Sequence, residues 1–168
     1  FRAVRFGLSE DIPVAEDYDG DGRADIAVFR PSDGVWHRLS SRDGTYAGEH
    51  FGASGDIPVP GDFDGDLKAD LAVFRNGVWY RRNSWDGNVT VAGFGLGGDR
   101  PTASDFDGDG RADYSVWRPS NGVWYASGSV SGEFRAIAFG LNGDAPVPLD
   151  FDGDGRFDEA VYRSGTWF

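Results

Sequence analysis

The chain has 168 residues, of which 39% are hydrophobic and 15% aromatic, and its formal net charge is −12 at pH 7. A chain of this length and composition can bury a substantial core, so we expect one folded domain rather than a disordered segment. The acidic balance argues against nucleic acid binding, which needs a Lys/Arg-rich surface, and no run of about 20 apolar residues predicts a membrane span. The absence of cysteine excludes disulfides, thiolate metal sites and a cysteine nucleophile.

One sequence unit recurs four times along the chain. A Phe-Gly pair repeats at spacings of 45, 43 and 45 residues, beginning at Phe6, Phe51, Phe94 and Phe139. A fixed period of this length is typical of folds in which each repeat packs against its neighbours. The predicted division is a closing strand at 1–7 and four units at 8–52, 53–95, 96–140 and 141–168.

Each unit predicts the same series of short strands. A proline-bearing strand is followed by an acidic loop and then by an apolar strand, at 26–30 in the first unit. A turn such as Asn76-Gly77, a strong hairpin signal, leads into a strand centred on Trp. No window has a sustained 3.6-residue apolar period, so we expect no α-helix of useful length. The sequence therefore predicts an all-β propeller of four four-stranded blades; a β-sandwich would not explain the strict period.

The two ends of the chain predict how the ring closes. Residues 1–7 read like residues 134–140, the last strand of the third unit, whereas the fourth unit ends at its third strand with Trp167 and Phe168. Pairing of residues 1–7 with that third strand would complete the fourth blade and remove a free sheet edge. The same pairing between chains would give an eight-bladed dimeric ring, or an open array if the rotation did not close. The sequence leaves these alternatives open.

Four nine-residue loops carry Asp at positions 1, 3, 5 and 9. Carboxylates at this spacing can surround one cation, and the backbone carbonyl at position 7 can add an oxygen, which is a ligand set that suits Ca²⁺ better than Mg²⁺. We expect one calcium ion per repeat, which would change the formal charge from −12 to −4; the alternative is four solvated acidic turns. The predicted ligands are Asp17, Asp19, Asp21, Arg23 and Asp25; Asp62, Asp64, Asp66, Lys68 and Asp70; Asp105, Asp107, Asp109, Arg111 and Asp113; and Asp150, Asp152, Asp154, Arg156 and Asp158.

Two further positions qualify this prediction. An EF-hand needs a bidentate Glu at position 12, where these loops have Val, as at Val28, so a helix–loop–helix sensor is excluded. In the second loop Leu67 replaces the glycine of the other three loops. A turn at this position requires a positive φ, which costs a non-glycine residue of order 1 kcal/mol. We therefore expect the second site to be the weakest.

No catalytic site is expected. His37 takes a position that is aromatic in the other units, so it is expected to be a packed ring, and His50 aligns with unrelated residues and is expected at the surface. No Ser, His and acid recur together in the pattern of a triad. The paired carboxylates belong to the loops, where a metal would keep them ionised and unable to act as general acids. We expect a protein that is not an enzyme.

The tryptophans fall into two groups. Trp36, Trp79, Trp124 and Trp167 repeat in register and are expected to pack between blades rather than to form a glycan platform. Trp85 lies in a loop with no counterpart in the other units. It is therefore the candidate for an exposed contact with a ligand.

The sequence resembles the FG-GAP (VCBS-type, integrin-α-like) repeat family. The resemblance rests on the Phe-Gly pair, the Gly-Asp-x-Pro-Val stretches at 55–59 and 143–147, and the Asp-x-Asp-Gly-Asp-Gly-x-x-Asp loop, and it covers essentially the whole chain. It implies a calcium-binding, propeller-forming protein outside the cell or on its surface, in a family whose propellers usually have more than four blades. The function that we expect is a calcium-stabilised interaction or adhesion module for a protein or glycan partner, without nucleic acid or membrane insertion. Alternatives are a structural block that self-assembles through its terminal strands, and a propeller-based hydrolase or lyase.

Overall fold

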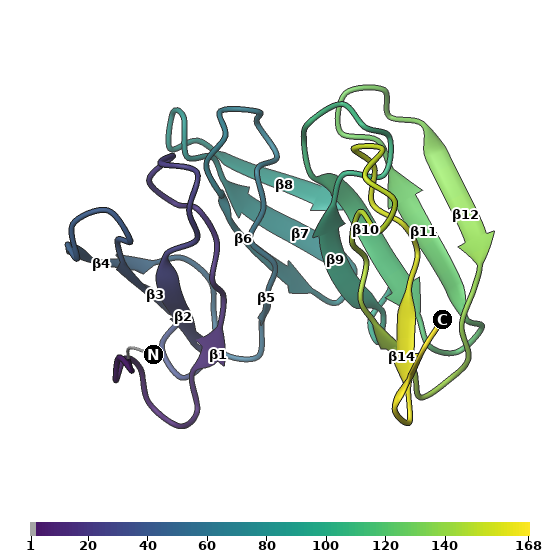
Figure 1. Ribbon diagram of the computed structural model, residues 1–168, viewed down its shortest axis with the longest axis horizontal. Coiled ribbons are helices and arrows are strands. Elements are labelled where there is room, and N and C mark those ends of the chain that lie inside the picture. The colour runs from purple at the N-terminus through teal and green to yellow at the C-terminus, as the bar shows by residue number, and fades with distance from the viewer. Residues whose placement is uncertain (1–2) are drawn as a thin grey trace.

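The computed structural model describes residues 3–168, which form fifteen short strands and no helix. The strands make four antiparallel sheets, arranged as the blades of a four-bladed β-propeller (Figure 1). The predicted all-β fold is thereby confirmed. Among these residues there is no helix long and apolar enough to cross a membrane.

The sheets follow one another along the chain, and each is a meander. The first contains β1 (Ile12–Pro13), β2 (Ile26–Arg30), β3 (Val35–Leu39) and β4 (Tyr46–His50). The second contains β5 (Ile57–Pro58), β6 (Leu71–Arg75), β7 (Val78–Arg82) and β8 (Val89–Gly93). The third contains β9 (Arg100–Ser104), β10 (Asp113–Arg118), β11 (Val123–Ser127) and β12 (Phe134–Ala138). The fourth contains β13 (Ala145–Pro146), β14 (Val161–Arg163) and β15 (Thr166–Trp167).

The hairpin turns follow from their residues. Asn76 and Gly77 have φ of 50° and 87°, so the two-residue turn between β6 and β7 has positive φ at both positions, as a type I′ turn requires. This turn sets the register in which Arg75 pairs with Val78 and Phe74 with Trp79. Because side chains of directly paired residues point to the same face of an antiparallel sheet, Phe74 and Trp79 lie on the same face of the blade.

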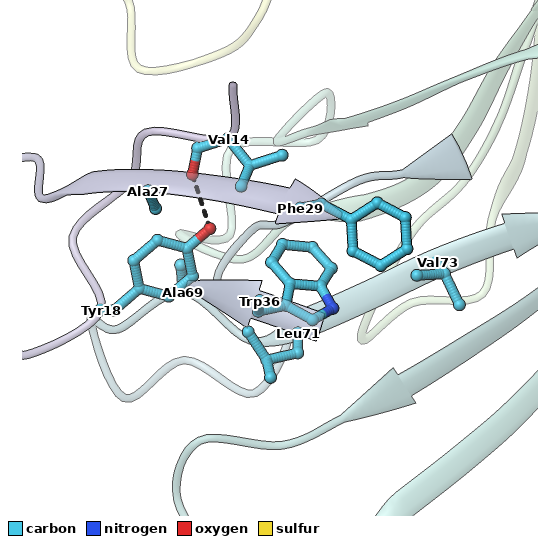
Figure 2. Close-up of a cluster of buried hydrophobic side chains, with 8 residues drawn as sticks. All are labelled: Val14, Tyr18, Ala27, Phe29, Trp36, Ala69, Leu71 and Val73. Atoms are coloured by element: carbon cyan, nitrogen blue, oxygen red, sulfur yellow. Dashed lines mark hydrogen bonds between the residues drawn. The ribbon is translucent and has the colours of Figure 1, made fainter. Parts of the chain in front are cut away.

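The core lies between successive blades. In the first interface Trp36 and Phe29 of the first blade pack with Leu71 and Val73 of the second. Figure 2 shows Trp36 at the centre of this cluster, with Phe29 on one side and Tyr18 on the other. Equivalent clusters join the second blade to the third and the third to the fourth. Burial of these facing sheet surfaces supplies most of the hydrophobic stabilisation of the fold, and only the second and third sheets are covered on both faces within residues 3–168.

The prediction of a closing strand at residues 1–7 is wrong for residues 3–7, the part that the structure describes. Residues 3–7 form no strand, and Phe1 and Arg2 lie outside the described residues. Phe6 instead packs edge-on against Tyr46 of β4, with 6.4 Å between the ring centroids, so this segment lies beside its own first blade. The fourth sheet has three strands, and in Figure 1 the first and fourth sheets lie on separate sides of the molecule.

The prediction for the repeated tryptophans holds for three of the four. Trp36, Trp79 and Trp124 are at most 3% exposed, and their indole N–H groups donate to the carbonyl oxygens of the next Phe-Gly pairs at 2.7–3.0 Å. Trp167 is 58% exposed. The reason is that no blade packs on the outer face of the fourth sheet within residues 3–168.

Candidate metal sites

Each acidic loop connects the first strand of its sheet to the second, and each gathers three carboxylates. In every loop one oxygen from each of three Asp residues lies within 4.8 Å of the other two, as the repeated spacing predicted. The sets are Asp17, Asp19 and Asp25; Asp62, Asp64 and Asp66; Asp105, Asp107 and Asp113; and Asp150, Asp152 and Asp158.

The clusters contain three of the four predicted carboxylates rather than all four. Positions 1 and 3 belong to every cluster, and position 9 completes three of them, whereas position 5 does so only in the second loop. The predicted ligands outside the described clusters are Asp21, Asp70, Asp109 and Asp154. The carbonyl groups of Arg23, Lys68, Arg111 and Arg156 stay predicted ligands, and at these residues the backbone N–H donates to the position-5 carboxylate at 2.8–2.9 Å.

The first Asp of each loop shapes the loop around itself. In the first loop Asp17 Oδ1 accepts the backbone N–H of Gly20 at 2.7 Å, and Oδ2 accepts the N–H of Gly22 at 2.7 Å. Gly20 and Gly22 have φ of 76° and 80°, a conformation that glycine adopts without steric cost and that directs these N–H groups inward. Burial opposes ionisation of Asp17, but the N–H donors outweigh it and lower the pKa of this carboxyl.

The last Asp of each of the first three loops connects the loop to the rest of its blade. Asp25 Oδ2 accepts the backbone N–H of Tyr18 at 3.1 Å, and Oδ1 accepts that of Ser41, in the turn after β3, at 2.7 Å. Asp70 and Asp113 make the same two kinds of bond in the second and third blades. All three side chains are buried. The outer hairpin turn of each of these blades is therefore held against the acidic loop.

Burial and mutual repulsion make these carboxylates costly to ionise without a counter-ion. Burial raises the pKa of Asp70 to about 6, with the negative charge of Asp64 adding to the effect and the backbone N–H donors opposing it. Burial likewise raises the pKa of Asp113 to about 6, with Asp107 and Asp105 adding to the effect. A divalent cation among these oxygens would reverse this, because it favours the ionised form.

The donor set fits a hard divalent cation. Asp19 Oδ1 is buried and has no hydrogen-bond partner among the described residues; the nearest cationic group is Arg42, whose guanidinium nitrogen is 3.6 Å away. A buried carboxylate oxygen without a partner carries a large desolvation cost. Coordination by this oxygen, together with those of Asp17 and Asp25, would remove that cost, and an all-oxygen set of this kind suits Ca²⁺.

The second loop has the strained residue that the sequence predicted. Leu67 has φ of 68°, close to the 80–85° of the glycines at the same position in the other loops. The side chain is 78% exposed, so packing does not offset the steric cost of this conformation. That the second site is the weakest stays a prediction, supported by this strain and by the different composition of its cluster.

Replacing the strained residue is expected to stabilise the second loop. Leu67→Gly should raise the free energy of unfolding by about 0.5–1 kcal/mol, because glycine adopts positive φ without a Cβ clash even after its greater unfolded-state entropy is counted. Urea unfolding measures the change, and calcium titration should show a tighter weakest site. Leu67→Ala is the matched control, since it removes the same side chain and keeps the strain. Equal stabilities of the two variants would contradict the strain argument.

Sequence reasoning missed a second charged motif that repeats in all four blades. The Asp of each Gly/Asp turn before the first strand forms a bidentate ion pair with the Arg nineteen residues later, as between Asp99 and Arg118, where both N–O distances are 2.8 Å. The four pairs are Asp11–Arg30, Asp56–Arg75, Asp99–Arg118 and Asp144–Arg163. The signal was present, because both residues recur with the period of the repeat.

These ion pairs hold the turn before the first strand against the second strand of each blade. The same carboxylate accepts the backbone N–H three residues earlier, as Asp144 does from Leu141 at 2.8 Å. In three blades the guanidinium also lies over an aromatic ring, and the distance from Arg118 to the Tyr125 centroid is 4.4 Å. In the first blade His37 stands in place of that ring. A bidentate, stacked arginine of this kind is not replaceable by lysine.

Low pH is expected to weaken the ion pair between Asp144 and Arg163 in the fourth blade. The hydrogen bond from Arg163 lowers the pKa of Asp144 to about 2, against the effect of burial. Since the folded-state pKa is below the unfolded value of 3.8, the stability from this pair is complete above about pH 4 and is lost as the pH falls toward 2. Melting curves of the wild type and Asp144→Asn should therefore converge between about pH 4 and 2. Asp86→Asn, in an exposed loop, is the control; a constant Asp144→Asn difference across this window would contradict the assignment.

The remaining predicted residues lie where expected, although their roles are untested. His37 is a half-buried ring stacked on Tyr46, whose hydroxyl lies 2.8 Å from His37 Nδ1. His50 is exposed at the end of β4. Trp85 is 79% exposed, in the turn between β7 and β8. Its backbone N–H donates to Asp64 Oδ2 at 3.3 Å, which connects this turn to the second acidic loop.

Comparison with known families accounts for the repeat. A family model described as an FG-GAP-like repeat matches residues 17–73 and 105–161. Each matched segment begins at the first Asp of one acidic loop and ends in the second strand of the next blade. No curated protein matches the chain. Because the two segments together cover more than half of the residues, the chain belongs to the FG-GAP-like repeat family.

Proposed function

We propose that the protein is a calcium-stabilised interaction module of the extracellular space or cell surface, which binds a protein or glycan partner and catalyses no reaction. The observation that carries this proposal is the carboxylate cluster that recurs in all four blades of an FG-GAP-like propeller. The buried oxygen of Asp19 and the raised pKa values of Asp70 and Asp113 support a bound cation.

Calcium would act at the junctions between blades. The backbone N–H of Ala69, in the second acidic loop, donates to the carbonyl oxygen of Asp17 in the first loop at 2.7 Å. The same bond runs from Ala112 to Asp62 at 2.6 Å. An ion held by the Asp17 cluster would therefore order its own loop and the contact with the next blade. Bound calcium would supply fixed positive charge, and the chain supplies the rigid frame.

The candidate contact with a partner is Trp85. Its ring is the most exposed large aromatic of the described chain, and an indole offers a wide apolar face at low entropic cost. The backbone N–H of Trp85 donates to Asp64 of the second acidic cluster, so the position of the ring would depend on calcium at that site. Partner binding is therefore proposed to be calcium-dependent.

A glycan array and a pull-down from extracellular fluid, each run in calcium and in EGTA, test this function. We expect binding in calcium only, and Trp85→Ala should weaken it by about tenfold or more, as truncation of a central aromatic contact does. Phe134→Ala, at a 63% exposed aromatic on the third blade, is the matched control and should bind like the wild type. No ligand in either assay, or equal loss in both variants, would contradict the proposal.

A second candidate function is a structural block that assembles from several chains. The observation that favours it is an apolar surface on the fourth blade, where Phe151, Tyr162 and Trp167 are each at least 40% exposed. Large aromatic side chains grouped on one sheet face are typical of an interaction surface.

A further inference from the structure

Strand β8 forms the outer edge of the second blade. It pairs with β7 on one side, and on the other side no strand lies beside it among residues 3–168. The second blade has all four of its strands, and the blades before and after it in the chain are four-stranded as well. The free edge is therefore a property of a complete, internal repeat.

The pairing with β7 determines which backbone groups of β8 are free. The N–H of Phe94, the residue after β8, donates to the carbonyl oxygen of Gly77 at 2.9 Å, so Phe94 belongs to a hydrogen-bonded pair. Bonded and non-bonded pairs alternate along an antiparallel ladder, so every second residue before Phe94 also bonds to β7. The residues between them direct their N–H and C=O groups away from the sheet. These are Val89, Val91 and Gly93, and all three are exposed.

The free edge of β8 is also apolar and uncharged. Its sequence, Val-Thr-Val-Ala-Gly, has no charged residue and no proline, and the side chains of Val89 and Val91 are 59% and 58% exposed. The outer strands of the first and third blades each contain a charged residue, Glu49 in β4 and Arg135 in β12. Charged residues and prolines in an edge strand disfavour its pairing with another chain. Of these three outer strands, β8 alone lacks such protection.

We infer that β8 binds an extended segment of a partner protein, which adds to the second blade as a fifth strand. The inference rests on the interaction module proposed above and specifies its partner as a protein rather than a glycan. The free N–H and C=O groups of β8 recur at every second residue. Another extended peptide offers the same groups at the same spacing, whereas the hydroxyl groups of a sugar do not.

The side chains and charge of the molecule describe the segment that fits. Side chains opposite Val89 and Val91 would pack against them, so the segment should be apolar at every second residue. The formal charge of −12 favours a segment that has Lys or Arg beside its apolar stretch. Trp85, in the turn that leads into β8, would contact the end of the same segment.

Selection in calcium from a phage-displayed library of random peptides of about twelve residues supplies the probes. We expect enriched peptides to alternate apolar residues and to carry flanking basic residues. Val91→Pro should weaken their binding by about tenfold or more, because it removes an outward N–H donor and keeps the bonds to β7. Ala136→Pro is the matched control, since Ala136 has the same position in β12 and is exposed, and it should bind like the wild type.

N-methylated forms of a selected peptide separate strand addition from apolar contact alone, and they are tested on the wild-type protein. A strand bonds through the N–H of every second residue, so methyl groups on one alternate set of amides should abolish binding and those on the other set should not. Equal loss from both sets, equal binding to the two proline variants, or no enriched peptide would overturn the inference. If a glycan or an extracellular partner still binds in calcium, the interaction module stands and strand addition alone fails.

Discussion

Chelating calcium with excess EGTA is expected to lower the melting temperature of the protein by about 20 °C or more. A ligand at 100 times its dissociation constant stabilises the folded state by about 2.7 kcal/mol per site, and the chain has four acidic clusters. For a chain of this size each kcal/mol changes the melting temperature by about 2–4 °C. Differential scanning calorimetry in calcium and in EGTA measures the shift directly.

The effect should be specific to the clusters and to calcium. Asp105→Asn combined with Asp107→Asn should remove one ion from the titrated stoichiometry and a corresponding part of the thermal shift. Asp86→Asn, at an exposed turn outside every described cluster, should leave both unchanged. Magnesium at the same concentration should restore little of the stability, because it keeps its waters and demands octahedral geometry. An unchanged melting temperature in EGTA would refute the metal sites in every blade.

Trp79→Ala is expected to lower the free energy of unfolding by about 3–5 kcal/mol, the usual range for a fully buried Trp. Trp79 is 0% exposed and makes aromatic contacts with Phe63, Phe74 and Tyr114 at 6.1, 5.5 and 5.3 Å between ring centroids. The truncation opens a cavity between the second and third blades and leaves the carbonyl oxygen of Phe94 without its indole donor. Urea unfolding gives the difference.

The repeat provides a matched control for this prediction. Trp167 occupies the same position in the fourth blade but is 58% exposed, so Trp167→Ala should cost less than about 1 kcal/mol when the chain is monomeric. The two variants remove the same side chain from the same local sequence and differ in the blade that packs on it. Similar losses in both variants would contradict the packing of successive blades described above.

Much of the candidate site was predictable because it depends on short stretches of chain. The spacing of Asp residues brings carboxylates together within each nine-residue loop, and the glycine pattern predicts positive φ, including the strained φ of Leu67. Which three carboxylates approach most closely was not predictable. In the first three loops, position 9 belongs to β10 or lies next to the second strand of its blade, and it accepts a hydrogen bond from a turn 14–16 residues away, as Asp70 does from Ser84.

By itself the sequence determined the repeat, the strand order, the hairpin turns and the acidic clusters, because each of these follows from residues close together along the chain. Tertiary structure alone decided which aromatic faces are buried, since Trp79 and Trp167 have similar neighbours in sequence and opposite exposures. It also placed Phe6 against Tyr46 instead of beside the fourth sheet. The physical reason is that burial depends on the blade that comes to lie opposite, and the local sequence of a repeat carries no information on whether that blade is present.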